Sequence, residues 1–233
     1  CNNEATLKEL YDRAVLFFCS LKLDHEIIFV DDGSKDGSLG LITGFYDQDP
    51  RVKIVKLKKN AGQSLAILAG LGISSGEVIV AIDADLQYAP EDISILLNKI
   101  NSGFDVVGGW RKQRSDPFLS RIFPSVFANF MARCRLGREF KDIGCFFIAF
   151  KKDMAVQVKK YGSQSRFLKP LFIKIGSFTE VEVNHYARKN GSSQFSFTRL
   201  IKIALDFMLN FSPVPGGRGA ELFVVERIYS RSV

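Results

Sequence analysis

The chain has 233 residues, of which 46% are hydrophobic and 24% are charged. These proportions are typical of a folded domain with a sizeable core, and they exclude a disordered chain or a minimal disulfide scaffold. The net charge of +7 is uneven, because residues 1–110 carry a net −6 whereas residues 111–233 carry +13 and most of the phenylalanines. Positive charge combined with aromatic side chains indicates an anionic or membrane-surface partner.

The cysteines are scattered, with no CxxC pair, and only two histidines accompany them. This spacing supports neither a zinc site nor a disulfide framework, and it favours a reducing compartment. No run of 18 apolar residues occurs, and no charged-then-apolar leader precedes the first predicted element, so we expect neither a membrane span nor a signal peptide in these residues. Because the chain begins at Cys1 rather than at methionine, we expect a fragment of a longer protein.

In the first half, short apolar runs alternate with segments of helical periodicity. An amphipathic helix is predicted at 4–23, followed by a buried strand at 26–30 that ends in a polar loop. The same rhythm continues with helices at 38–46, 63–73 and 90–101, and with strands at 52–57, 78–82 and 105–108. This alternation predicts an α/β sandwich around a mostly parallel sheet.

The second half begins with a phenylalanine-rich segment at 117–134, which predicts an amphipathic helix that starts or kinks at Pro124. Its apolar stripe has arginine flanks, so a core face and a membrane-facing surface both remain open. Further strands are predicted at 146–150 and 179–185, and a last helix at 197–210. Residues 216–233 show no assignable pattern.

Pairs of aspartates follow two of the predicted strands. Asp31 and Asp32 end the strand at 26–30, where open α/β sheets bind ligands, and they could accept hydrogen bonds from a base or a ribose. The alternative is local capping of the next helix with Asx-turn chemistry at Ser34 and Asp36. Asp83 and Asp85 follow the strand at 78–82, and two such close carboxylates suit a hard cation such as Mg²⁺ or Mn²⁺.

Five ordered motifs make a family resemblance visible: EIIFVDDGSKDGS, LKKNAGQSLAILAGLGISSGEVIVAIDADLQYAPEDI, DVVGGWR, DIGCFFIAF and HYARKNGSSQF. Together they resemble the inverting glycosyltransferases of family 2, and within them the subgroup that uses dolichyl or undecaprenyl phosphate. The resemblance covers residues 1–215 and implies a GT-A fold. In that fold a first strand would precede Cys1, and residues 216–233 stand where the subgroup often continues into a transmembrane region.

The resemblance also implies roles for individual residues. Asp31 and Asp32 correspond to the nucleotide-contacting pair. The divalent-metal set corresponds to Asp83, Asp85 and Gln87, with Asp85 as the more direct ligand. Mg²⁺ or Mn²⁺ is the implied cofactor.

The basic half supplies the implied phosphate and acceptor contacts. Three arginines resemble those that hold the donor diphosphate and the acceptor phosphate, namely Arg111, Arg121 and Arg188. Asp142 matches an acidic residue on the acceptor side, which we expect to orient the acceptor or an arginine. Ser192 and Ser193 fall in what resembles the acceptor loop.

The chain departs from the family pattern at three positions. Gln194 and Phe195 replace a basic residue and a tyrosine in the acceptor loop, and Ile148 stands where an arginine is common. His185, beside that loop, is interpreted as structural rather than catalytic, because it ends a strand without an evident partner.

The implied function is metal-dependent transfer of a sugar from a nucleotide diphosphate to a polyprenyl phosphate at the cytoplasmic face of a membrane. Two alternatives stay open: a family 2 transferase with a saccharide acceptor, and a catalytically defunct basic protein that binds a membrane surface. Nucleic acid is the poorer partner, because the basic residues form no recognition module.

Overall fold

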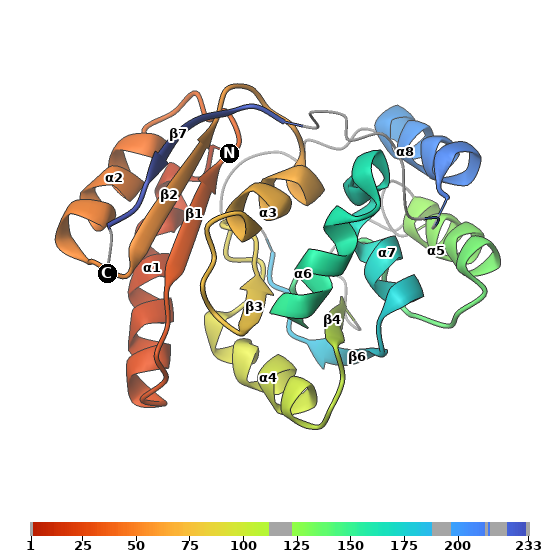
Figure 1. Ribbon diagram of the computed structural model, residues 1–233, viewed down its shortest axis with the longest axis horizontal. Coiled ribbons are helices and arrows are strands. Elements are labelled where there is room, and N and C mark those ends of the chain that lie inside the picture. The colour runs from red at the N-terminus through yellow and green to blue at the C-terminus, as the bar shows by residue number, and fades with distance from the viewer. Residues whose placement is uncertain (1, 112–122, 188–196, 213, 215–222, 232–233) are drawn as a thin grey trace.

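The computed structural model describes residues 2–111, 123–187, 197–212, 214 and 223–231 (Figure 1). The helices are α1 (Glu4–Ser20), α2 (Ser38–Gln48), α3 (Gln63–Leu71), α4 (Ile93–Asn101), α5 (Phe123–Leu136), α6 (Lys152–Lys159), α7 (Leu168–Ile175) and α8 (Phe197–Asn210), with the 3-10 helices η1 (Pro90–Asp92) and η3 (Gly162–Phe167). The strands are β1 (Ile27–Asp31), β2 (Val52–Leu57), β3 (Val78–Ala81), β4 (Val106–Arg111), β5 (Ile148–Lys151), β6 (Phe178–Val183) and β7 (Val225–Tyr229). The α/β class expected from the sequence is confirmed.

The first sheet has the order β1-β2-β7, and helices cover both of its faces. On one face Ile54 packs with apolar residues of α1 and α2, among them Leu7 and Ile42. On the other face Val55 packs against Ala69 of α3. Alternate residues of a strand point to opposite faces, so the apolar run of β2 serves both layers.

The second sheet has the order β3-β5-β4-β6 and is sandwiched in the same way. One face carries a core that includes Leu96 and Ile100 of α4. The other face packs against α5, α7 and α8 in the largest apolar cluster, in which Phe150 contacts Phe172. The helix α5, which begins at Phe123, and α8 lie side by side beyond this sheet (Figure 1).

The strand directions are more mixed than the sequence rhythm indicates, and the expectation of a mostly parallel sheet is corrected in this respect. The pairs β1–β2 and β4–β6 are parallel, whereas β2–β7, β3–β5 and β4–β5 are antiparallel. The difference arises because β5 inserts between β3 and β4 after the long excursion through α5. Hydrophobic periodicity reports that a strand exists, but it does not report its direction.

This topology brings several strand ends to one edge of the second sheet. Ala81 near the end of β3 and Gly108 in β4 both lie opposite Ile148, the first residue of β5. Arg111 at the end of β4 lies opposite Val183 at the end of β6. The loops that follow β3, β4 and β6, and the loop that precedes β5, therefore meet at the same edge.

Most predicted elements are confirmed to within a few residues, and β2 and α8 have the predicted bounds. The sequence reasoning missed α6, α7 and β7, the last of which lies in the segment at 216–233. Among the described strands, β1 and β3 each end a sheet, so no partner is seen on their outer edges. The expected strand before Cys1 and the domain boundary at residue 215 stay predictions. Within the ranges given above, no helix is long and apolar enough to cross a bilayer.

Candidate active site

The loop after β3 presents the acidic pair Asp83 and Asp85 at the sheet edge. Asp85 is buried, and its Oδ1 accepts a hydrogen bond of 3.1 Å from the backbone N–H of Gln87. Between them, Leu86 has φ = +58°, a left-handed conformation that is unfavourable for a branched side chain. The chain thus reverses tightly at Leu86, and this backbone strain is of the kind that concentrates at functional sites.

The donor set of this loop fits a hard divalent cation. The two carboxylates and the Gln87 side chain offer oxygen ligands, which Mg²⁺ and Mn²⁺ prefer. In the part of the chain that the structure describes, no group of three or more His, Cys, Asp or Glu side chains could hold a metal. A cation held here would therefore depend on ligands beyond the two carboxylates, such as phosphate oxygens and water.

The carboxylates at the end of β1 hold the loops around them in place. Asp31 accepts a 3.0 Å hydrogen bond from the N–H of Ser34, which is the local turn chemistry considered as the alternative for this segment. Asp32 accepts hydrogen bonds from the N–H groups of Ala61 and Gly62, at 2.6 and 3.0 Å. Their nucleotide-binding role stays a prediction, and these contacts show that both carboxylates also shape the loop.

Gly33 explains how this loop packs so closely. Its φ is +74°, and a side chain there would place a Cβ 3.0 Å from the backbone nitrogen of Asn60. Glycine suits both the backbone angle and the contact. The loops after β1 and after β2 are therefore held against each other.

The two acidic strand ends are joined by short polar links. Gln63, which follows the residues held by Asp32, donates its side-chain amide to Oδ1 of Asp83. The hydroxyl of Thr6 donates to the carbonyl oxygen of Ala84 at 2.6 Å. A hollow of about 180 Å³ lies beside Asp85, and its lining includes Asn2, Asn3, Glu4, Thr6 and Asp36. The structure thus brings the predicted nucleotide and metal residues into one region that spans the two sheets.

Arg111 and Asp142 form a buried ion pair with two hydrogen bonds at this edge. Nε and Nη2 of Arg111 donate to the two carboxylate oxygens of Asp142 at 2.7 and 3.0 Å, and Asp142 is only 2% exposed. Burial acts to lower the pKa of Arg111, but the hydrogen bonds and charge of Asp142 outweigh it, so the pKa is raised. The guanidinium stays cationic, as a group that binds phosphate must.

The loop after β3 also carries a buried aromatic side chain, Tyr88. Tyr88 stacks on Phe147 and contacts the ring of His185. Burial raises the pKa of the Tyr88 hydroxyl, and it likewise raises the pKa of the Cys145 thiol, so both stay protonated. These groups pack the site rather than supply a base.

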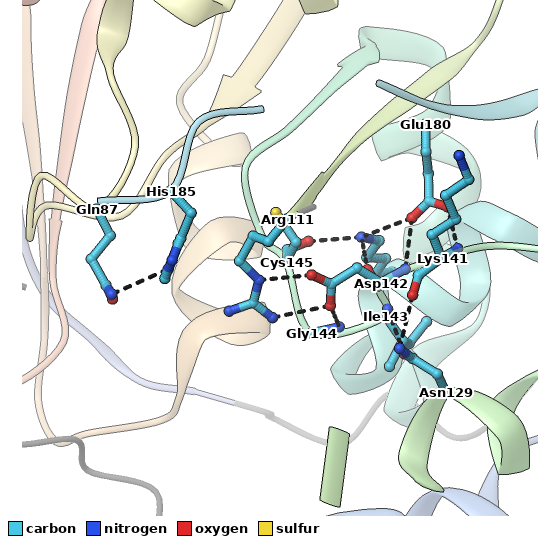
Figure 2. Close-up of polar contacts among 11 residues, drawn as sticks. Gln87, Arg111, Asn129, Lys141, Asp142, Ile143, Gly144, Cys145, Glu180 and His185 are labelled. Carbon is cyan, nitrogen blue, oxygen red and sulfur yellow. Dashed lines mark hydrogen bonds and ion pairs between the residues drawn. The ribbon is translucent and has the colours of Figure 1, made fainter. Parts of the chain in front are cut away.

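The sequence interpretation of His185 as a structural residue without an evident partner is corrected in one respect, because His185 contacts Gln87. Its Nε2 lies 3.2 Å from the side-chain nitrogen of Gln87 (Figure 2). The backbone N–H of Tyr186 donates to the carbonyl oxygen of Gln87. The segment after β6 is therefore attached to the loop after β3. The available signal was the position of His185 at the start of the HYARKNGSSQF motif.

Several predicted residues lie outside the described part of the chain. They are Arg121, Arg188, Ser192, Ser193, Gln194 and Phe195. Ile148 is described, and it is buried at the start of β5 between β3 and β4. An arginine there would be buried among apolar side chains, so its absence keeps the sheet edge packed.

The family model for glycosyl transferase family 2 matches residues 1–158. The chain belongs to this family. It is 33% identical over 216 residues to an undecaprenyl-phosphate 4-deoxy-4-formamido-L-arabinose transferase of Shewanella sediminis, and 34% identical over 217 residues to the protein of the same name from Salmonella choleraesuis. Both alignments cover 92% of this chain. The chain spans 65% and 66% of these relatives, just under two thirds of their length.

Solved structures confirm the GT-A fold of this family 2 chain. Mannosyl-3-phosphoglycerate synthase from Rubrobacter xylanophilus superposes with a TM-score of 0.64 at 14% identity, covering 99% of this chain and 82% of that one. Glucosyl-3-phosphoglycerate synthase from Mycobacterium tuberculosis, solved with Mn²⁺, UDP-glucose and phosphoglyceric acid, gives 0.58 at 18% identity, covering 88% and 73%. At these identities the likeness concerns the fold alone.

Proposed function

We propose that this family 2 chain transfers a sugar from a nucleotide diphosphate sugar to a polyprenyl phosphate. The observation that carries the proposal is the shared sheet edge, where the strand that leads into the acidic loop with Asp83 and Asp85 ends beside the strand that carries Arg111, whose guanidinium is paired with Asp142. A nucleotide sugar and a lipid phosphate together bring several negative charges, which a divalent cation held by the two aspartates would offset together with the Arg111 guanidinium. The names of the curated relatives support the choice of acceptor.

A divalent cation, Mg²⁺ or Mn²⁺, is part of the proposal. Asp83, Asp85 and Gln87 would hold it, and when bound it would neutralise charge on the leaving nucleoside diphosphate. The donor set, described above, supports this assignment. Arg111, with Arg121 and Arg188 beyond the described residues, would supply further positive charge toward the two phosphate groups.

The acceptor needs little activation by the protein. A phosphate monoester has its second pKa at about 6, so a polyprenyl phosphate is mostly dianionic at neutral pH and already nucleophilic. Both carboxylate oxygens of Asp142 accept hydrogen bonds from Arg111. This engagement supports a role for Asp142 as the residue that orients the arginine, and not as a general base.

An apolar surface on α5 and α8 is the proposed membrane contact, at the cytoplasmic face. Leu205 and Leu209 lie one turn apart on α8 and are 54% and 79% exposed, and Phe130 on neighbouring α5 is 59% exposed. Exposed Lys202 lies one turn before Leu205. Apolar side chains with a basic neighbour are the composition expected for a surface that enters the headgroup region of an anionic bilayer.

The test supplies purified chain with a panel of nucleotide sugars, with and without Mn²⁺ or Mg²⁺, and with detergent-solubilised undecaprenyl phosphate. We expect metal-dependent formation of a lipid-linked sugar with one donor, and none when free saccharides replace the lipid. Transfer to saccharides alone would replace this proposal with the saccharide-acceptor alternative. Retention on anionic vesicles without nucleotide-sugar binding would support the defunct surface-binding alternative.

A further inference from the structure

The loop from Lys141 to Cys145, which carries Asp142, is held by three side chains from three different elements. They are Asn129 on α5, Lys169 on α7 and Glu180 on β6 (Figure 2). No part of the proposed reaction uses these three residues directly. Their arrangement suggests that they determine where Asp142 lies.

Lys169 makes the most unusual of these contacts. Its side chain is 1% exposed, and Nζ donates to the carbonyl oxygens of Asp142 and Cys145 at 2.5 and 2.8 Å. Nζ lies 3.9 Å from Oε1 of Glu180, so the backbone carbonyls are its closer partners. The ammonium therefore bridges the two ends of the turn that carries Asp142.

The other two side chains bind the backbone of the same loop. Glu180 accepts hydrogen bonds from the N–H groups of Lys141 and Asp142. Asn129 donates to the carbonyl oxygen of Lys141 at 2.8 Å and accepts from the N–H of Ile143 at 2.9 Å. The backbone N–H and C=O of Asp142 are both fixed, so its side chain leaves the loop in a set direction.

The placement of an ammonium here requires a physical reason. A buried cation loses its hydration, and an apolar side chain of similar size often serves stability equally well. Gly108 lies beside it, and a Cβ at that position would come 3.3 Å from Nζ. An ammonium, unlike a methionine, donates hydrogen bonds to two loop carbonyls and pairs with Glu180, which itself binds the loop, so its contribution acts on the shape of the loop.

We infer that Lys169 is a positioning residue: it fixes the Asp142 loop so that Asp142 holds the Arg111 guanidinium toward the phosphate groups. This inference rests on the proposed function for its catalytic consequence. Its structural consequence, the position of the loop from Lys141 to Cys145, does not depend on the proposed function, because that position can be measured without an activity assay. The shared chain of contacts runs from Nζ of Lys169 through Asp142 to Arg111.

The protein carries its own reporter of this loop. Trp110 is its only tryptophan, and Nζ of Lys141 lies 4.1 Å from the centre of its ring. A shift of the loop would move this cation and change the fluorescence of Trp110. The reporter works whether or not the chain is assayed with the correct donor.

The experiment compares Lys169→Met with the control Lys174→Met. Lys174 lies on the same helix and is exposed, and its Nζ donates to the carbonyl oxygen of Leu136, which lies outside the loop. We expect Lys169→Met to lower kcat at least tenfold and to shift Trp110 emission, while the control leaves both unchanged. In an Arg111→Lys background, Lys169→Met should lower kcat less than twofold further, because the two changes act through one contact. Asn129→Leu should reproduce the phenotype if Lys169→Met does not fold.

Equal loss of kcat in both Arg111 backgrounds would overturn the inference, as would unchanged Trp110 emission in folded Lys169→Met and Asn129→Leu. If the wild-type chain shows no transfer with any donor, the proposed function fails. In that case the emission of the variants still decides whether Lys169 holds the loop.

Discussion

The guanidinium of Arg111 and the carboxylate of Asp142 meet side by side, with two parallel hydrogen bonds of 2.7 and 3.0 Å. Arg111 ends β4, and Asp142 lies in the loop that leads to the neighbouring strand β5. The charge of Arg111 is therefore oriented before any ligand binds. Such prior orientation is the main way in which a protein stabilises charge that develops during a reaction.

Replacing Asp85 should abolish transfer and leave the fold intact. Asp85→Asn keeps the size of the side chain and its contact with Gln87 but removes the charge that a divalent cation needs. We expect kcat to fall about a thousandfold, in line with the several kcal/mol that metal-assisted charge stabilisation contributes. The measurement is the transfer rate over a Mn²⁺ titration, with circular dichroism as the check on folding. Asp24→Asn, at an exposed aspartate, is the matched control, and an undiminished rate in Asp85→Asn would refute the metal assignment.

Arg111→Lys tests whether the geometry of the cation matters beyond its charge. Lysine cannot make two parallel hydrogen bonds to one carboxylate, so we expect kcat/KM to fall roughly 10- to 100-fold. Arg51→Lys is the control, because Arg51 makes the same two-bond contact with Asp49 beside the first residues of β2, far from the strand ends of the site. A similar fall in both variants would mean that the loss reflects stability.

The ion pair between Arg51 and Asp49 should make the free energy of unfolding depend on pH. Hydrogen bonds from Arg51 lower the pKa of Asp49 to about 2, from a usual 3.8. Because the folded pKa is the lower one, the pair stabilises the fold above about pH 4, and this contribution is lost as the pH falls toward 2. Asp49→Asn should remove on the order of 2 kcal/mol at neutral pH and flatten the decline between pH 4 and 2.

Urea unfolding at a series of pH values measures this effect. The exposed residue Asp47 provides the control variant Asp47→Asn. If wild-type protein and Asp49→Asn lose stability with the same slope below pH 4, the pair makes no such contribution.

Charge introduced on the exposed face of α8 should weaken membrane binding. Leu205→Glu with Leu209→Glu removes two apolar contacts and adds two negative charges, so we expect at least a tenfold lower affinity for vesicles that contain anionic lipid. Leu16→Glu, at an exposed leucine on α1, should bind as wild type does. Vesicle sedimentation measures all three proteins, and equal retention would exclude this face as the contact.

The elements that the sequence predicts well are those with a strong local signal. The strand at 52–57 is a short apolar run between polar turns, and α8 has a clear helical period. The loop after β3 and the arginine that ends β4 could be placed at one edge because strand ends converge in an α/β sheet. These features depend on neighbours in the sequence and on a general rule of topology.

The elements that were missed depend on contacts between distant segments. Lysine is a residue type that usually lies at the surface. Only the folded structure surrounds Lys169 with the carbonyls of a loop about 25 residues earlier in the chain. The helix α7 contains Pro170, which the first turn tolerates but which weakens the helical signal. Hydrophobic periodicity cannot predict the buried position of Lys169, because that position depends on a segment that is distant in the sequence.

The pairing of β7 with β2 bears on how the molecule assembles. Lys56 and Glu226 form an ion pair across 170 positions of the chain, and Leu57 lies opposite Val225. We expect contacts so remote in sequence to form late, because a long loop must close first. Until then the outer edge of β2 presents unpaired backbone groups on an apolar strand, which is a template for association with another chain. Removing residues 216–233 should therefore reveal itself first as self-association at high protein concentration.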